Sequence, residues 1–331
     1  MDLFTTLFLM SSGLFLGWSL GANDAGNILG AAVGSRMLPF RRAAIIGSVF
    51  VVIGAVAGVG GTSETLGRLG QIQELEHAFL VALSAALCIL FYTRHSLPVS
   101  ATQAIVGGIL GWNVYTATAG DWDVLGTVAA SWLASPVLAG LLSLALYRVI
   151  RKCLKLLSLH MFSQDLLLRW ALALAGAFGA YSLGRNNIAN VMGVFVESAP
   201  FTSFSIFALE LSSVQALFFL GGLAIASGIL SYSRKVMMTI GSDLYHLSPE
   251  NALVAVLSVS LTLFLFSLPG PVQVPVSSSQ AAVGAVIGVA AARGDFRVDT
   301  SMLMMIILGW ILTPVTAGVF SWMLLTLFSG V

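Results

Sequence analysis

The sequence predicts an all-α polytopic membrane protein built from two inverted-topology repeats of about five crossings each. Three observations predict this fold. Of the 331 residues, 58% are hydrophobic and only 9% are charged, whereas soluble domains average about 25% charged residues. Apolar runs long enough to span a bilayer recur along the whole chain. The most polar stretch of the first half, Gly21 to Gly30, returns in the second half as Gly184 to Gly193, so the two halves share a motif.

The positions of the basic residues predict the orientation in the membrane. Lys and Arg gather in a few short connections, such as Arg36 to Arg42, Arg148 to Arg169, and Arg234 with Lys235. By the positive-inside rule these connections are cytoplasmic, and the acidic or neutral connections between them lie outside. An odd number of crossings in each half makes the halves inverted and places both termini outside. We therefore expect a multi-pass protein of the cell (plasma or inner) membrane.

The crossings follow from this threading. The first half is expected to cross at about 3–35, 43–61, 78–93, 98–112 and 124–147, and the second half at about 166–197, 211–232, 250–268, 275–292 and 301–328. The predicted domains are an N-terminal transmembrane repeat (1–147), a basic cytoplasmic linker (148–168) and a C-terminal inverted transmembrane repeat (169–331). The linker alternates basic residues with Leu and Phe, so it fits an amphipathic helix on the anionic leaflet or a solvated connector.

Two of the apolar runs are too long for one simple helix. The runs from Leu3 to Ser35 and from Leu166 to Glu197 exceed the roughly 20 residues that a spanning helix needs. Because a polar, glycine-bounded motif interrupts each run, the sequence predicts broken helices, together with helical hairpin-like segments that meet at the midplane. Inverted repeats place a binding site at their interface near the midplane.

The repeated polar motif supplies candidate cation ligands. A carboxylate in the bilayer core costs about 2.5 to 3.5 kcal/mol, so Asp24 is a candidate functional residue. Carboxylate, amide and carbonyl oxygens suit sodium, and no cluster of His or Cys indicates a softer metal. Helix packing is the alternative role for glycine pairs such as Gly30 and Gly34. The candidate cation-binding residues are Asn23, Asp24, Asn27, Asn186, Asn187 and Asn190, with sodium expected at Asp24 and Asn27.

A second repeated motif supplies candidate oxyanion ligands. The segment PVSATQAIVGGILG (Pro98 to Gly111) returns as PVSSSQAAVGAVIG (Pro275 to Gly288), with eight of fourteen positions identical. We interpret each copy as a helix start with Pro at the first position, where free N–H groups and the positive end of the helix dipole attract anions. Capping of a buried half-helix is the alternative. The candidate residues are Ser100, Thr102, Gln103, Ser277, Ser278, Ser279 and Gln280.

A third pair of motifs follows in the same order. Trp132 to Pro136, with Gly140, matches Trp310 to Pro314, with Gly318. No hydrolase, zinc-protease or Walker motif occurs, so we expect neither an enzyme nor ATP drive. No nucleic-acid partner is expected, and a coupling ion takes the place of a cofactor.

Together these motifs resemble the inorganic phosphate transporter family, also called PiT. The resemblance rests on GANDAGN, its degenerate copy, and the paired PVSATQA and PVSSSQA segments, and it covers both halves. It implies symport of inorganic phosphate with sodium or protons, import by alternating access around a midplane site built by both copies, and a possible homodimer. The candidate cation and oxyanion residues named above all lie at positions that match these motifs.

The chain departs from the family at one place. The family usually keeps an Asp in the second motif, where this chain reads Gly184-Arg185-Asn186-Asn187. The hypothesis is that Arg185 replaces a coupling cation or touches the oxyanion, because its fork suits tetrahedral oxyanions. Snorkelling of Arg185 to the outer interface is the alternative.

The function also has alternatives. The sequence leaves open a sulfate or other oxyanion permease, proton coupling, and a passive anion channel. A channel should show a continuous polar lining. A compact polar cluster between apolar flanks favours alternating access instead.

Overall fold

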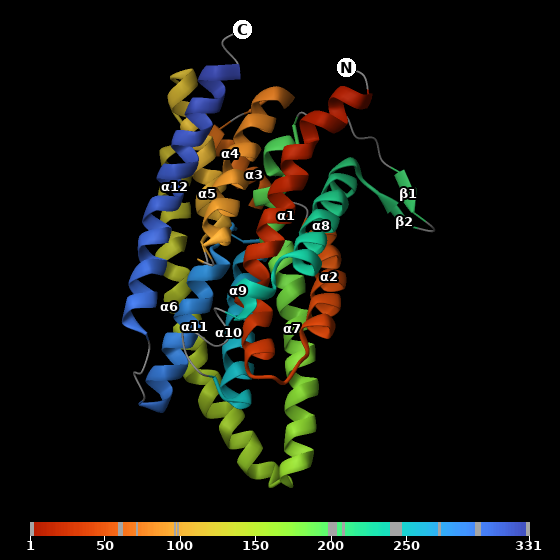
Figure 1. Ribbon diagram of the computed structural model, residues 1–331, viewed down its shortest axis with the longest axis vertical. Helices are drawn as coiled ribbons and strands as arrows, with labels where there is room; N and C mark the ends of the chain where they lie inside the picture. Colours follow the sequence, from red (N-terminus) through yellow and green to blue (C-terminus); the bar gives the residue numbers. More distant parts are fainter. Residues whose placement is uncertain are drawn as a thin grey trace.

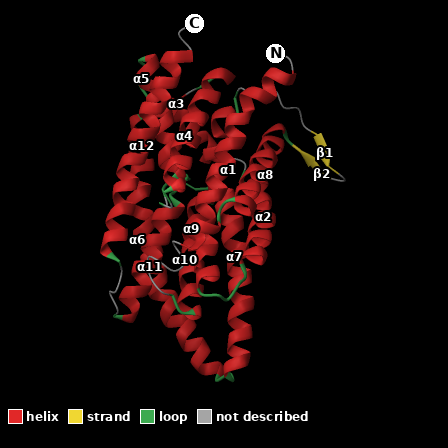
Figure 2. Cartoon of the chain, in the orientation of Figure 1, coloured by secondary structure: helices red, strands yellow, loops and turns green. Residues whose placement is uncertain are grey.

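The computed structural model describes residues 3–58, 62–70, 72–95, 97, 99–197, 204–206, 209–238, 247–270, 273–294 and 299–328. It is almost entirely helical (Figure 2). The helices of the first half are α1 (Leu3–Gly34), α2 (Phe40–Ala57), α3 (Thr62–Gly70), α4 (Leu75–Arg94), α5 (Ala101–Thr116) and α6 (Trp122–Leu157). Those of the second half are α7 (Met161–Met192), the 3₁₀ turn η1 (Gly193–Phe195), α8 (Ser213–Ser231), α9 (Arg234–Met238), α10 (Pro249–Ser267), α11 (Ser278–Arg293) and α12 (Thr300–Phe328).

A short antiparallel strand pair departs from the all-α prediction. Strands β1 (Phe204–Ile206) and β2 (Leu209–Leu211) form a hairpin beside the start of α8. The hairpin lies at the edge of the bundle, near the end that carries the N-terminus (Figure 1).

Eight helices, rather than the expected ten, are long and apolar enough to cross a membrane among the described residues. They are α1, α2, α4, α6, α7, α8, α10 and α12. The expected crossings at 98–112 and 275–292 correspond to α5 and α11, which have 16 residues each. At 1.5 Å per residue each rises only about 24 Å, short of the roughly 30 Å hydrocarbon core. Both helices begin near the middle of the bundle and run toward opposite ends (Figure 1).

Helices of one half pack against helices of the other half, and equivalent helices of the two halves have equivalent partners. Helix α1 packs against α8, and α7 against α2. Helix α6 packs against α11, and α12 against α5. In Figure 1, α1 runs away from the end that carries both termini, whereas α7 runs toward that end. The second half therefore repeats the arrangement of the first in the reverse direction.

The third repeated motif explains how the half-helices are seated. A Cβ atom at Gly284 of α11 would overlap the Pro136 carbonyl of α6, and one at Gly107 of α5 would overlap the Pro314 carbonyl of α12. The glycines let each half-helix lie directly against the backbone of the longer helix at its proline.

The predicted breaks in α1 and α7 were wrong. Both helices continue through the repeated polar motif, to Gly34 and Met192 respectively. The motif glycines serve close packing instead of unwinding. A Cβ atom at Gly21 would overlap the carbonyl of Ile225, and one at Gly184 would overlap that of Val51. The backbone carbonyls of the motif are therefore not freed for a cation, and any ligand must meet side chains.

The starts of the half-helices also differ from the prediction. Ser100 and Ser277 are the N-cap residues of α5 and α11, and each hydroxyl accepts the backbone N–H three residues on. Pro275 therefore lies in the extended segment before α11 and not at its first position. Pro98, the other proline of this prediction, lies outside the described residues.

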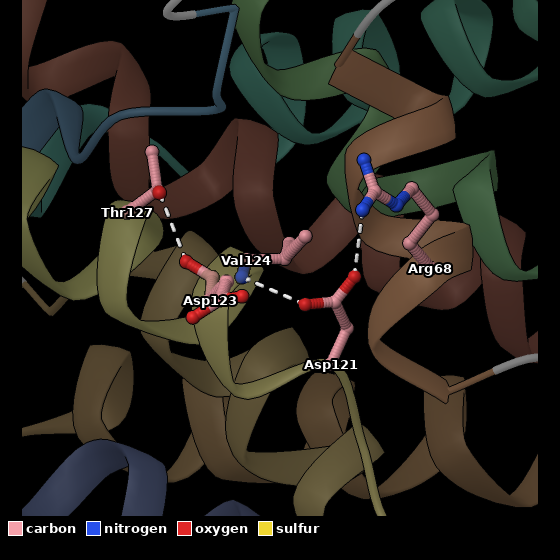
Figure 3. A network of polar contacts seen from close by, with 5 residues as sticks. All are labelled: Arg68, Asp121, Asp123, Val124 and Thr127. Carbon is pink, nitrogen blue, oxygen red and sulfur yellow. Dashed lines mark hydrogen bonds and ion pairs between the residues drawn. The ribbon is translucent and has the colours of Figure 1, made fainter.

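Charged side chains lie at both ends of the molecule, in a basic segment at one end and in an ion pair at the other. The α6–α7 turn lies at the end opposite both termini (Figure 1). The basic segment 148–168 forms the last turns of α6 and the first of α7, joined by a short turn at Ser158 to His160. At the terminus end, Arg68 of α3 donates to Asp121, the N-cap residue of α6, at 2.7 Å (Figure 3). Because the Val124 backbone N–H also donates to Asp121 and Arg68 lies beside it, the pKa of this carboxyl is lowered.

Candidate functional site

The repeated motifs meet in one buried cluster between the two halves. Helices α1 and α7 contribute the Asn and Asp side chains, and the first turns of α5 and α11 contribute hydroxyls and amides. Asp24 is 1% exposed, and no other acidic or basic side chain in the described part of the chain is buried. The predicted residues that are buried are Asn23, Asp24, Asn27, Ser100, Thr102, Gln103, Asn186, Asn187, Asn190, Ser277, Ser278, Ser279 and Gln280.

Asp24 joins the two repeats. Its Oδ2 atom accepts hydrogen bonds from Ser278 Oγ at 2.9 Å and from Asn187 Nδ2 at 3.1 Å. Asn187 occupies the position of α7 that corresponds to Asp24 of α1, so equivalent residues of the two repeats touch directly. Hydrogen bonds to an ionised group are stronger than neutral ones. The carboxylate thus holds α1, α7 and the start of α11 together.

Each motif helix also contacts the half-helix of the other repeat. Asn27 Nδ2 on α1 donates to Ser278 Oγ of α11 at 2.9 Å. Asn190 Nδ2 on α7 donates to Thr102 Oγ1 of α5 at the same distance. Asn27 and Asn190 are equivalent positions, but their partners are one position apart, because Thr102 corresponds to Ser279 and not to Ser278.

Asn186 and Asn23 secure the extended segments that precede the half-helices. Asn186 Nδ2 donates to the Val276 carbonyl at 2.9 Å, and the Val276 N–H donates to Asn186 Oδ1 at 3.1 Å. The Asn23 amide is satisfied when its nitrogen donates to the Val99 carbonyl and to Asp24 Oδ1, both at 3.2 Å, and its oxygen accepts from Thr93. In the opposite orientation that oxygen would face only acceptors. Val99 and Val276 are equivalent residues, so this orientation gives both repeats the same contact.

Four amide oxygens in the cluster are buried without a hydrogen-bond partner among the described residues. They form two equivalent pairs, the Oδ1 atoms of Asn27 and Asn190 and the Oε1 atoms of Gln103 and Gln280. A buried acceptor left unpaired costs about 1 to 3 kcal/mol. Oxygens of this kind are suitable ligands for a hard cation, and they also accept from a protonated oxyanion. The chemistry of these groups therefore fits a small cation or a hydroxyl-bearing anion.

The hydroxyls of the cluster are donors with protein acceptors close by. Ser278 donates to Asp24, and Thr102 donates to the Val276 carbonyl at 3.3 Å. Ser277 and Ser279 share a hydrogen bond at 3.1 Å. The N-termini of α5 and α11 both lie at the cluster, so free N–H groups and two positive helix ends face the same region. An anion bound there would take hydroxyl donors from these protein acceptors.

Arg185 lies apart from these contacts. Its side chain is half-buried, and Nε donates to the carbonyl of Ser267 at 3.3 Å while Nη1 donates to the Tyr181 hydroxyl at 3.5 Å. Sequence reasoning missed Thr93, whose hydroxyl bonds to Asn23. Thr93 lies near the end of an apolar helix and outside the repeated motifs, so no pattern in the sequence distinguished it.

Comparison with known proteins gives a consistent relationship over nearly the whole chain. The sequence pattern of the Phosphate transporter family matches residues 20–321. A Methanocaldococcus jannaschii protein named as a phosphate permease is 27% identical, with 92% of this chain and 91% of that protein covered. A protein of Haemophilus influenzae with the same kind of name is 26% identical, with 93% and 92% covered.

The same comparison extends to a solved structure. A structure titled the sodium-dependent phosphate transporter is 23% identical and superposes with a TM-score of 0.80, covering 98% of this chain and 99% of that one. At this identity the likeness establishes the fold of the chain.

Proposed function

The chain belongs to the phosphate transporter family, and we propose that it imports inorganic phosphate by symport with sodium, using alternating access around the buried cluster. Family membership makes it a multi-pass membrane transporter and not an enzyme. The coupling ion, the direction of transport and the roles of individual residues are the content of the proposal. The sodium-dependent phosphate transporter that shares the fold supports sodium as the coupling ion.

One observation carries the proposal. The buried Asp24 carboxylate sits at the junction of the two repeats, hydrogen-bonded to Asn187 and Ser278, beside four amide oxygens without partners. We assign the cation to Asp24 and Asn27, with the other amide oxygens of the cluster as further ligands. We assign the phosphate to the first turns of α5 and α11, where Ser100, Thr102 and Ser277 to Ser279 supply hydroxyl donors. Sodium would then offset the charge of Asp24, and the positive ends of α5 and α11 would face the anion.

The arrangement of the halves supports alternating access. Helices of the two halves run in opposite directions, as in transporters built from inverted-topology repeats. The end with the basic α6–α7 turn is assigned to the cytoplasm and the end with both termini to the outside. The site would open to one side of the membrane while the opposite side stays closed.

Uptake into proteoliposomes tests the proposal. Labelled phosphate uptake by the reconstituted chain would be measured at fixed pH with an inward sodium gradient, with an equal potassium gradient, and with excess unlabelled sulfate. Sodium-driven accumulation that sulfate leaves intact is the expected result. Blockade by sulfate would reassign the substrate, and uptake that ignores sodium but follows a proton gradient would reassign the coupling ion. Equilibration without accumulation would indicate a channel.

A further inference from the structure

Two tryptophans of the third repeated motif carry buried indole N–H groups that the proposed function does not use. Trp132 of α6 and Trp310 of α12 occupy equivalent positions in the two repeats. Both side chains are half-buried, and the Nε1 atom of each is buried without a hydrogen-bond partner among the described residues. A buried donor left unpaired costs about 1 to 3 kcal/mol. The same unpaired donor thus recurs in both repeats.

The packing of α12 against α5 shows what lies beside the tryptophan of α12. A Cβ atom at Gly107 of α5 would overlap the Pro314 carbonyl of α12. One turn later in both helices, a Cβ atom at Gly111 would overlap the Gly318 carbonyl. The two helices therefore run side by side in the same direction (Figure 1).

Trp310 lies one turn before these contacts, level with Gln103 in the first turn of α5. A further contact supports this placement. A Cβ atom at Gly309 would lie 3.5 Å from the side chain of Val99, the residue before the N-cap of α5. Helix α12 therefore passes the polar cluster at Trp310.

The second half-helix has the same register against its long partner. A Cβ atom at Gly284 of α11 would overlap the Pro136 carbonyl of α6, and the next turn of both helices repeats this contact. One turn before these contacts, Trp132 lies level with Gln280 in the first turn of α11. Each tryptophan is therefore matched with the equivalent glutamine of the cluster.

These glutamines carry the acceptors that the tryptophans lack. The Oε1 atoms of Gln103 and Gln280 are buried without a hydrogen-bond partner among the described residues, as are the two indole nitrogens. An unpaired donor and an unpaired acceptor thus lie at the same level of adjacent helices in both repeats. An indole N–H can only donate, so the carboxamide must turn its oxygen, and not its nitrogen, toward the tryptophan if the two are to bond.

We propose that Trp310 and Trp132 are positioning residues that orient the carboxamides of Gln103 and Gln280, so that both amide nitrogens donate to the bound oxyanion. The inference rests on the proposed function, because it requires an anion at the first turns of α5 and α11. A carboxamide in the opposite orientation would present its oxygen to the anion and repel it. When the indole donates to Oε1, the N–H groups of Nε2 are left for the anion. The further ligands of the cation are then the asparagine oxygens alone.

Binding of labelled phosphate to the purified full chain tests the proposal. W310F keeps an aromatic ring and removes the N–H group, as does W132F. In saturating sodium, the dissociation constant of phosphate should rise about threefold to tenfold in each variant, as expected for the loss of one hydrogen bond. The control is W112F, which removes another buried and unpaired indole N–H, one whose counterpart in the second repeat is Val289. W112F should leave the dissociation constant unchanged.

A double-mutant cycle separates positioning from a general structural role. Q103M removes the carboxamide and keeps the length of the side chain. Because the tryptophan acts only through the glutamine, W310F combined with Q103M should bind phosphate no more weakly than Q103M alone. Additive effects of the two substitutions would overturn the proposal. If W310F does not yield a folded protein, W132F with Q280M decides in the same way.

Labelled sulfate, measured in parallel, distinguishes failure of the inference from failure of the proposed function. Normal phosphate binding by W310F and W132F, with sodium-driven uptake intact, would overturn the inference and leave the proposed function standing. Binding of sulfate in place of phosphate, weakened by W310F, would overturn the proposed function and leave the inference standing. Binding of neither anion by the unchanged chain would overturn both.

Discussion

Replacing Asp24 by Asn separates the functional role of this carboxylate from a structural one. The substitution keeps the shape of the side chain and removes its charge. Asp24 is 1% exposed, and Oδ2 accepts from Ser278 at 2.9 Å and from Asn187 at 3.1 Å. We expect D24N to fold and to lose sodium-driven uptake.

The effect on stability should be small because two terms oppose each other. Removing a carboxylate from the membrane core gains about 2.5 to 3.5 kcal/mol. Three hydrogen bonds to a charged acceptor, from Ser278, Asn187 and Asn23, become neutral ones, and each loses about 1 to 1.5 kcal/mol. The net loss is about 1 kcal/mol, so the unfolding temperature of D24N should lie within a few degrees of that of the unchanged chain.

The effect on the cation should be large. A carboxylate about 4 Å from a sodium ion contributes about 4 kcal/mol at an effective dielectric constant near 20. This is about a thousandfold in affinity. The half-saturating sodium concentration for labelled phosphate uptake into proteoliposomes should therefore move beyond the measurable range.

The control is D123N, which removes an exposed carboxylate in the first turn of α6 and should change neither quantity. Uptake by D24N with a half-saturating sodium concentration within about threefold of normal would refute the assignment of the cation to Asp24. Collapse of the unfolding temperature would instead make the carboxylate structural.

Three further predictions follow from other contacts. S278A removes the donor to Asp24 and the acceptor of Asn27 Nδ2, and each buried group left unpaired costs about 1 to 3 kcal/mol, so phosphate uptake should fall at least about tenfold. The control S84A loses only a hydrogen bond within its own helix and should transport phosphate normally. G21A should lower the free energy of unfolding by about 1 to 3 kcal/mol because the new Cβ overlaps the Ile225 carbonyl, whereas G67A, with open space around its Cβ, should stabilise α3 by up to about 1 kcal/mol. Equal unfolding temperatures for the two variants would contradict the packing role of Gly21. D121A should lower the unfolding temperature at neutral pH, because it removes the α6 cap and the partner of Arg68 (Figure 3). The pKa of Asp121 is lowered in the folded chain, so the difference between D121A and the unchanged chain should disappear as the pH falls through that lowered pKa. A difference in unfolding temperature that persists in acid would contradict this prediction.

Much of the fold and most of the candidate site could be predicted from the sequence. Composition determined a membrane protein, because so few charged residues cannot cover a soluble surface. The repeated motifs determined which residues belong together, since Asn23 to Asn27 and Ser277 to Gln280 recur in both halves and a carboxylate such as Asp24 is too costly in a bilayer without a purpose. All the predicted cluster residues except Arg185 are buried where the halves meet.

The tertiary structure alone decided what the glycines and the short apolar segments do. Glycine permits either an unwound backbone or close helix packing, and only the Ile225 carbonyl against Gly21 selects packing. An apolar segment of 16 residues reads as a crossing until its start is placed at the middle of the bundle, as for α5 and α11. Likewise the pairing of Asp24 with Asn187, and of Arg185 with Ser267, depends on residues far apart in the chain, and a linear pattern carries no information about their distance in space.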